Sequence, residues 1–286
     1  MSTLRQQLIQ ELVLRGCSPR TPEAYVSAVY QLAKYYRRSP DQLSDAQIRD
    51  YLFYLAERKK LSASSRNQAT SALRFFYARV LGRSVEQVMR VLPRVRQEVR
   101  RPQVFASGEL ERLFTIGCPH PRHRAFLMTV YGAGLRLNEA CHLKSEHILS
   151  ERQQIRVVQG KGNKDRYTLL SPRLLEELRR YWKWCRPAHW LFPASRNPQA
   201  PMIDATGQRI FYRAVERAGL PDKGGIHSLR HSFATHLLEA GVEITIVQRL
   251  LGHSSLSTTS TYLHVRQERL AQIAGPLQLL DLSRLA

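Results

Sequence analysis

Four residues between positions 227 and 265 have side chains that could act together on a phosphate ester. His227 and Arg230 are three residues apart in an amphipathic segment, a spacing that places both on one face of a helix. His253 lies in a Leu-Gly-His-Ser turn, and Tyr262 follows nine residues later. A guanidinium can bind two phosphate oxygens, an imidazole can donate or transfer protons, and a phenol can act as a nucleophile. A phosphate ester suits this set better than any other common substrate.

Two further candidates lie earlier in the chain. Arg136 follows a Gly-Ala-Gly bend at the start of a helical segment, where it could point inward with Glu139 orienting it; a surface ion pair of these two residues is an equal alternative. From Gln154 onward the apolar residues alternate, so that two short strands and a Gly-rich turn predict a β-hairpin. Its tip would expose Lys161 and Lys164, either to solvent or toward a DNA groove.

The charge of the chain indicates a polyanionic partner. Its 286 residues, of which 43% are hydrophobic, are sufficient for two domains that each bury a core. There are 44 basic and 23 acidic residues, giving a net charge of +21. Of these, 19 basic and 8 acidic residues lie at or before Pro102, and 25 and 15 follow it, so both parts are basic. This distribution predicts a polyanion bound from two sides, with a general solubility bias as the alternative.

Cysteine use and hydropathy predict a cytoplasmic protein. The four cysteines form no Cys-x-x-Cys pair, and no signal peptide or apolar run long enough for a membrane span is visible. We therefore expect free thiols in a reducing compartment. Cys141, His142 and His147 lack a second Cys/His pair at ligand spacing, so a metal site is not expected there.

The pattern of apolar residues predicts two domains. Residues 1–92 predict a helical domain, with Thr21 and Ser44 as N-caps, and residues 93–105 are a basic linker with two prolines. Residues 106–286 predict a mostly helical domain that contains the hairpin and ends in an apolar tail. The tryptophans are expected to pack in a core or between domains. A basic face near the fourth helix could lie on a DNA backbone, although each residue alone could equally be solvated: Lys59, Lys60, Arg66 and Arg74.

The motifs GAGLRLNEA, QGKGNKDR, HSLRHSFATHLLEAG and LGHSSLSTTSTYLHV occur in this order. Together they resemble the tyrosine recombinase, or phage integrase, family over roughly residues 105–270. The compact spacing is most similar to Xer-like recombinases and small mobile-element integrases. The resemblance implies a mainly α fold with a small β-hairpin or sheet. It also implies two domains, a SAM-like core-binding domain and a mostly helical catalytic domain.

The resemblance also assigns roles at the phosphate. Arg136, Arg230 and His253 would bind its non-bridging oxygens and stabilise the charge of the transition state. Tyr262 would attack phosphorus, forming a 3′-phosphotyrosine, and Lys161 would protonate the leaving 5′ oxygen.

Two further roles concern the neighbours of these groups. His227 would assist proton transfer at the nucleophile, and Glu139 would hold Arg136 without taking part in the chemistry. The arginines and histidines are expected to lower the pKa of Tyr262. No metal, ATP or other cofactor is implied, because arginines supply the positive charge and the phosphotyrosine conserves the bond energy.

The implied partners are double-stranded DNA with specific recombination sites and three further copies of the chain. Four protomers would synapse two sites and exchange strands through a Holliday junction, whereas the free protein would be a monomer or weak dimer in the bacterial cytoplasm. The apolar tail would pack on a neighbouring protomer or on its own chain. Accessory directionality proteins are further expected partners. The alternative functions are a type IB topoisomerase-like relaxase and a non-catalytic DNA-binding accessory protein.

Overall fold

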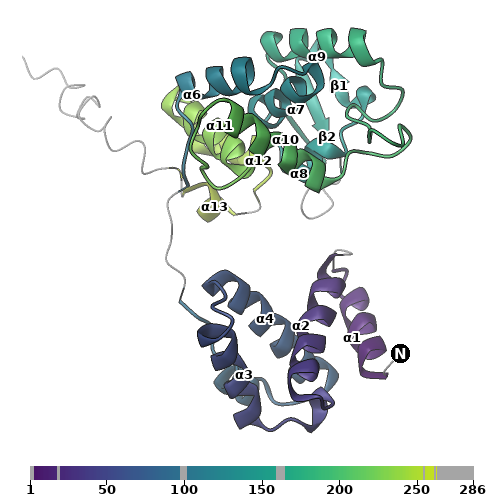
Figure 1. Cartoon of the computed structure of the whole chain (residues 1–286), viewed down its shortest axis with the longest axis vertical. Coiled ribbons are helices and arrows are strands. Elements are labelled where there is room, and N and C mark those ends of the chain that lie inside the picture. Colours follow the sequence, from purple (N-terminus) through teal and green to yellow (C-terminus); the bar gives the residue numbers. More distant parts are fainter. Residues whose placement is uncertain are drawn as a thin grey trace, which may run out of the picture. The chain divides into compact units, whose positions relative to one another are not determined.

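The computed structural model describes residues 3–17, 20–96, 102–158, 165–253, 255–260 and 262. The chain divides into two compact units, Met1–Arg100 and Arg101–Ala286, and each is described by itself (Figure 1). The predicted fold class, mainly α with a small sheet, is confirmed. Within the described ranges, no helix is both long and apolar enough to cross a membrane.

The first unit is helical. Its α-helices are α1 (Thr3–Leu14), α2 (Arg20–Tyr36), α3 (Asp45–Glu57), α4 (Ala63–Phe75) and α5 (Val85–Val91), with a 3-10 turn at Pro40–Gln42 and a π-type turn at Phe76–Val80. Helix α3 begins as predicted at Ser44, whose hydroxyl accepts from the Gln47 backbone while the Gln47 side chain accepts from Ser44 N. Helix α2 begins one residue before the expected N-cap, Thr21. The buried faces of these helices form one core, which includes Leu32, Leu73 and Phe76.

The second unit surrounds a larger core. Its helices are α6 (Ser107–Arg112), α7 (Pro121–Gly132), α8 (Leu137–Cys141), α9 (Pro172–Cys185), α10 (Asp204–Arg217), α11 (His227–Glu239), α12 (Ile244–Leu251) and α13 (Leu256–Ser260). A π-type turn spans Leu113–Gly117, and 3-10 turns span Ser145–His147 and Ser150–Arg152. Helix α11 packs against α7 and α12, and α12 packs against α13 and the sheet. These packed elements carry the candidate site.

The sheet has three antiparallel strands in the order β1 (Ile148–Leu149), β2 (Gln154–Val157) and β3 (Arg166–Leu169). The β2–β3 pair, in which Ile155 faces Thr168, confirms the predicted hairpin, whereas β1 was not predicted. A two-residue strand is too short to produce a visible alternation. Ile155 and Val157 are buried, so one face of the hairpin belongs to the core.

A second apolar cluster lies beside the main core. It contains Phe233, Ala234 and Leu238 of α11, Val247 and Leu251 of α12, and Tyr262. The phenol expected to be the nucleophile is therefore fixed by packing between two helices.

Two of the tryptophans, which were predicted to pack in a core or between domains, do not lie in a core. Trp182 and Trp184 on α9 are 48% and 58% exposed. The buried face of α9 is formed by Leu174, Leu178 and Tyr181, at spacings of four and three residues. Positions 182 and 184 lie at the two edges of that face.

Candidate active site

A tight bend between α7 and α8 aims Arg136. Gly134 has φ +59°, and a Cβ atom there would lie 2.4 Å from Phe233 Cδ1, so only glycine fits. Arg136 is the N-cap residue of α8, and its backbone nitrogen donates to Glu139 Oε2 at 2.8 Å. This N-terminal cap fixes both residues of the predicted Arg136–Glu139 pair.

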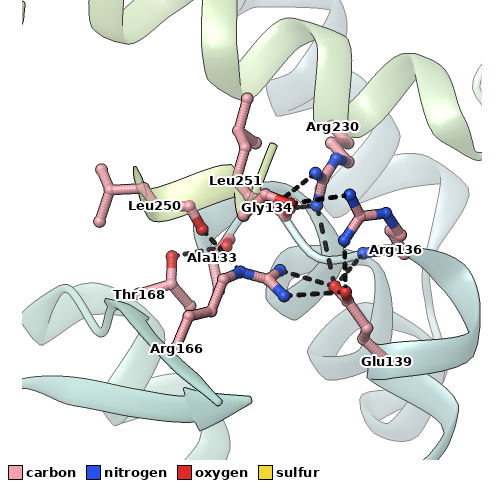
Figure 2. A network of polar contacts seen from close by, with 10 residues as sticks. Ala133, Gly134, Arg136, Glu139, Arg166, Thr168, Arg230, Leu250 and Leu251 are labelled. Atoms are coloured by element: carbon pink, nitrogen blue, oxygen red, sulfur yellow. Dashed lines mark hydrogen bonds and ion pairs between the residues drawn. The ribbon is translucent and has the colours of Figure 1, made fainter. Parts of the chain in front are cut away.

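Glu139 is the centre of the site, as Figure 2 shows. Arg136 Nη1 donates to Oε1 at 2.7 Å, and Arg166 donates from both terminal nitrogens, at 2.8 Å to Oε1 and 2.7 Å to Oε2. Arg230 Nη1 lies 3.7 Å from Oε2. Burial raises the pKa of Glu139, but Arg166 and then Arg136 outweigh it and lower that pKa to about 2. One carboxylate therefore organises three guanidinium groups.

Arg230 is held by main-chain carbonyls. It lies in the first turn of α11, is only 5% exposed, and donates to Gly134 O and Leu251 O at 2.6 Å each. These carbonyls lie at the C-terminal ends of α7 and α12, where the helix dipole is negative and favours a cation. Two of the five guanidinium N–H groups are used in these bonds. The guanidinium thus has fixed geometry and retains donors for a ligand.

Arg166 is a site residue that the sequence interpretation missed. Besides its two bonds to Glu139, its Nε donates to Leu250 O at 2.9 Å. Gly252, with φ +63°, makes room for it, because a Cβ atom there would lie 2.6 Å from Arg166 Cδ. A signal was present: Arg166 and Thr168 share one face of β3, and Thr168 donates to Ala133 O at 2.8 Å. Both side chains of this face donate hydrogen bonds to main-chain carbonyl oxygens at the C-terminal ends of helices.

Replacing Arg166 with alanine is expected to lower the free energy of unfolding of the second unit by about 3 kcal/mol, because it leaves a buried carboxylate less compensated. Urea unfolding followed by tryptophan fluorescence measures this, since all three tryptophans lie in that unit. The control is Arg156→Ala, which removes only the exposed ion pair with Asp165. It should leave the unfolding midpoint unchanged; equal effects of the two substitutions would contradict a central role for Arg166.

His253 follows Gly252 at the end of α12. Its Nδ1 lies 2.9 Å from the hydroxyl oxygen of the buried Thr259. Burial, and then the charges of Arg230 and Arg136, lower the pKa of His253 to about 4, so the ring is neutral at pH 7. If Thr259 donates to Nδ1, the ring proton lies on Nε2, which becomes a hydrogen-bond donor. A neutral donor next to two arginines suits an anionic ligand.

Tyr262 contacts a histidine that the sequence interpretation did not select. His231 Nδ1 lies 2.7 Å from Tyr262 Oη, and the ring centroids are 5.7 Å apart. Tyr262 is 4% exposed. Burial raises its pKa more than Arg230 and Arg136 lower it, so the expectation of a lowered pKa is wrong in direction. The spacing could have indicated His231, which is four residues after His227 and on the same helical face.

His227 is the first residue of α11. The residue is exposed, yet desolvation by the surrounding protein, and then Arg230 and Arg136, lower its pKa. His227 is therefore accessible to solvent and close enough to the two arginines for their charges to affect its pKa.

The predicted hairpin lysines, Lys161 and Lys164, lie outside the described residues. The described ends of the hairpin are Val158 and Asp165, and Asp165 forms an ion pair with Arg156 at 2.8 Å. The strand that follows the loop begins at Arg166, which is bound to Glu139. The described strand β3 therefore contributes to the site through its first residue, Arg166.

The candidate DNA contacts of the first unit differ in their surroundings. Lys59 and Lys60 are exposed. Arg66 is half-buried on α4. Arg74 donates its Nε to Leu92 O at 2.7 Å, the C-cap carbonyl of α5. Arg74 thus has a structural partner, whereas the two lysines are open to a ligand.

The assembled site favours a compact anion. Three guanidinium groups and one carboxylate leave a net positive charge in a partly buried setting, where charge-assisted hydrogen bonds are strong. The phenol of Tyr262, whose pKa is raised, and three histidines, whose pKa values are lowered, border it. A phosphate bound there would meet hydrogen-bond donors, a nucleophile and proton-transfer groups.

Comparison with known proteins gives a consistent result. Residues 103–269 match the model of the phage integrase family, and residues 4–87 match its N-terminal SAM-like domain. Protein y4qK of Sinorhizobium fredii is 41% identical, covering 98% of this chain and 90% of its own. Tyrosine recombinase XerA of Pyrococcus horikoshii is 31% identical, covering 98% and 95%. The crystal structure of the XerH site-specific recombinase bound to palindromic difH substrate shares the fold, with a TM-score of 0.71, 22% identity and coverage of 90% and 80%.

Proposed function

Because the chain belongs to the phage integrase family of recombinases, we propose that it is a site-specific recombinase that cuts and rejoins DNA through a 3′-phosphotyrosine. The observation that supports this most directly is the cluster of Arg136, Arg166 and Arg230 on Glu139, with Tyr262 packed beside α11. This arrangement combines a binding site for a phosphodiester with a phenol nucleophile.

In the proposed cleavage step, Arg136, Arg230 and His253 bind the non-bridging oxygens of the scissile phosphate. Their donors are fixed before the reaction by carbonyls, by Glu139 and by Thr259, so little reorganisation is needed as charge develops on phosphorus. Tyr262 Oη attacks phosphorus and the bond to the 5′ oxygen breaks.

The remaining groups serve the leaving side and the orientation of the site. Lys161 protonates the 5′ oxygen, so that a free 5′-hydroxyl is released. Glu139 and Arg166 orient the phosphate-binding arginines and do not touch the substrate. His227 is exposed and can contact the DNA strand next to the scissile phosphate.

The assembly is proposed from the relatives. The XerH structure contains substrate DNA after cleavage, and a λ integrase fragment has been solved as a dimer on a core site. We infer that this chain binds double-stranded DNA, with Lys59 and Lys60 contacting the backbone, and that four protomers exchange strands through a Holliday junction. The apolar tail, which lies outside the described residues, would link neighbouring protomers. The role fits a bacterial mobile element and a cytoplasmic location, with accessory proteins setting direction.

The test is covalent capture on DNA selected for binding from a random duplex pool. Each duplex is nicked close to the cleavage position, so that the short 5′-hydroxyl fragment diffuses away and the intermediate accumulates. We expect a protein–DNA adduct on denaturing gels, with the DNA-linked peptide containing Tyr262. The absence of an adduct on tightly bound DNA would leave only the non-catalytic DNA-binding function. Recombination between two intact sites would exclude a topoisomerase-like relaxase.

A further inference from the structure

We propose that His231 accepts the proton of Tyr262 during cleavage, the role that the family resemblance implies for His227. The inference rests on the proposed strand cleavage and names the group that activates its nucleophile. It is carried by the 2.7 Å separation of His231 Nδ1 and Tyr262 Oη. Such a distance is that of a hydrogen bond along which a proton can move.

The position of His231 follows from its neighbours on α11. Arg230, the preceding residue, is fixed by Gly134 O and Leu251 O. The phenol ring of Tyr262 is packed among Phe233, Leu238 and Leu251, in the cluster that joins α11 to α12. The proton acceptor and the phosphate-binding arginine are therefore consecutive residues of one rigid turn, so that binding of the phosphate by Arg230 brings it close to the phenol.

The charges around His231 keep its ring able to accept a proton. Burial, and then His227 and Arg230, lower its pKa to about 4, and Arg136 adds to the positive surroundings of the neighbouring Tyr262. The imidazole is thus neutral at pH 7. Tyr262 has a raised pKa and reaches the reaction protonated, so it needs an acceptor. The negative scissile phosphate raises the basicity of the imidazole as the substrate binds.

The proton balance is complete. In the productive tautomer His231 carries its proton on Nε2, and Nδ1 accepts the phenol proton as Oη bonds to phosphorus. The phosphorus bond to the 5′ oxygen breaks, and Lys161 donates a proton to that oxygen. In rejoining, the attacking 5′-hydroxyl returns a proton to Lys161 and His231 returns its proton to the departing Tyr262. No proton is gained or lost over one cleavage and rejoining.

His227 has a different setting. It is exposed at the first position of α11, whereas the described hydrogen bond of Tyr262 Oη is made with His231. His227 does lower the pKa of His231, because two neighbouring imidazoles disfavour each other's protonation, and it makes no described hydrogen bond to the phenol.

The experiment compares His231→Asn with wild type in single-turnover cleavage of the nicked duplex between pH 7 and 9. The asparagine oxygen can accept the phenol hydrogen bond near the place of Nδ1 but cannot take the proton. The cleavage rate of wild type should be nearly independent of pH in this range. The variant should be slower by about 10²–10⁴-fold at pH 7. Its rate should then rise about tenfold per pH unit, because the phenol must ionise first.

The control is His227→Asn, which should keep the flat profile of wild type. If His231→Asn cleaves as fast as wild type or faster, the proposal is overturned. The hydrogen bond between His231 and Tyr262 would then only hold the tyrosine in its resting position. A cleavage rate of His231→Asn that is lower than that of wild type by the same factor at every pH would also overturn the proposal. So would a cleavage rate of His227→Asn that rises tenfold per pH unit. Thermal unfolding and DNA binding of both variants identify loss of folding, and His231→Ala provides a second variant with the same expected slope. Wild type forming no adduct would instead reject the proposed function.

Discussion

Replacing Tyr262 with phenylalanine is expected to abolish the covalent protein–DNA adduct, reducing cleavage at least about 10⁴-fold. The ring stays packed against α11 and α12, and one hydrogen bond to His231 is lost, so the free energy of unfolding should fall by only about 1 kcal/mol. Affinity for DNA should be nearly unchanged, because the arginines that bind the phosphate keep their carbonyl partners. Denaturing gels and equilibrium binding measure the two effects separately.

Tyr131→Phe is the matched control. Tyr131 Oη lies 2.9 Å from Nδ1 of His236, so it too forms a tyrosine–histidine pair with α11. This variant should lose a similar amount of stability and form the adduct normally. An adduct formed by Tyr262→Phe would show that another residue is the nucleophile. Equal loss of cleavage in both variants would attribute the effect to packing of α11.

Replacing Glu139 with alanine is expected to destabilise the second unit by about 3–5 kcal/mol, because it leaves buried guanidinium groups without their carboxylate. Cleavage by the folded fraction should fall at least about 100-fold, since Arg136 loses the partner that orients it. The pKa of Glu139 is about 2, so its charge contributes stability above its ordinary pKa of 4.5, and that contribution is lost only as pH falls through about 2. The effect should therefore be the same at pH 6 and pH 8.

Glu177→Ala provides the comparison. Glu177 on α9 has a side chain only 6% exposed and pairs with Arg124 at 2.7 Å and Arg180 at 3.0 Å. Its loss should lower stability to a similar degree, while cleavage per folded molecule stays at the wild-type level. Glu139→Ala with normal cleavage per folded molecule would show that the carboxylate has only a structural role.

Local elements could be predicted from the sequence because their causes are local. Ser44 caps α3 as expected, and alternation of apolar residues indicated the β2–β3 hairpin. The exposed tryptophans of α9 show the limit, since residue type favoured burial while the helical spacing did not. For a helix such as α9, the spacing of all its apolar residues determines which face is buried, and the type of a single residue does not.

The site was predicted only in part. Arg136, Glu139 and Arg230 lie within motifs whose resemblance to a family identified them, and the structure brings them together. Arg166 and His231 were not selected, because strand and helix spacing show which face they share but not their contacts with Glu139 and Tyr262, which join distant segments. The direction of the Tyr262 pKa was also inaccessible, since the sequence shows nearby charges but not the extent of burial.

The carbonyl contacts of the arginines affect how this site can change in evolution. Arg230 and Arg166 donate to oxygens of Gly134, Leu250 and Leu251, which belong to the main chain. An amino-acid substitution replaces a side chain but leaves the main-chain carbonyl oxygen of that residue in place. No single substitution therefore removes one of these acceptors. The acceptors are inherited with the ends of α7 and α12, so side chains there can vary while the phosphate-binding geometry is maintained, except at Gly134 and Gly252, where a Cβ atom would clash.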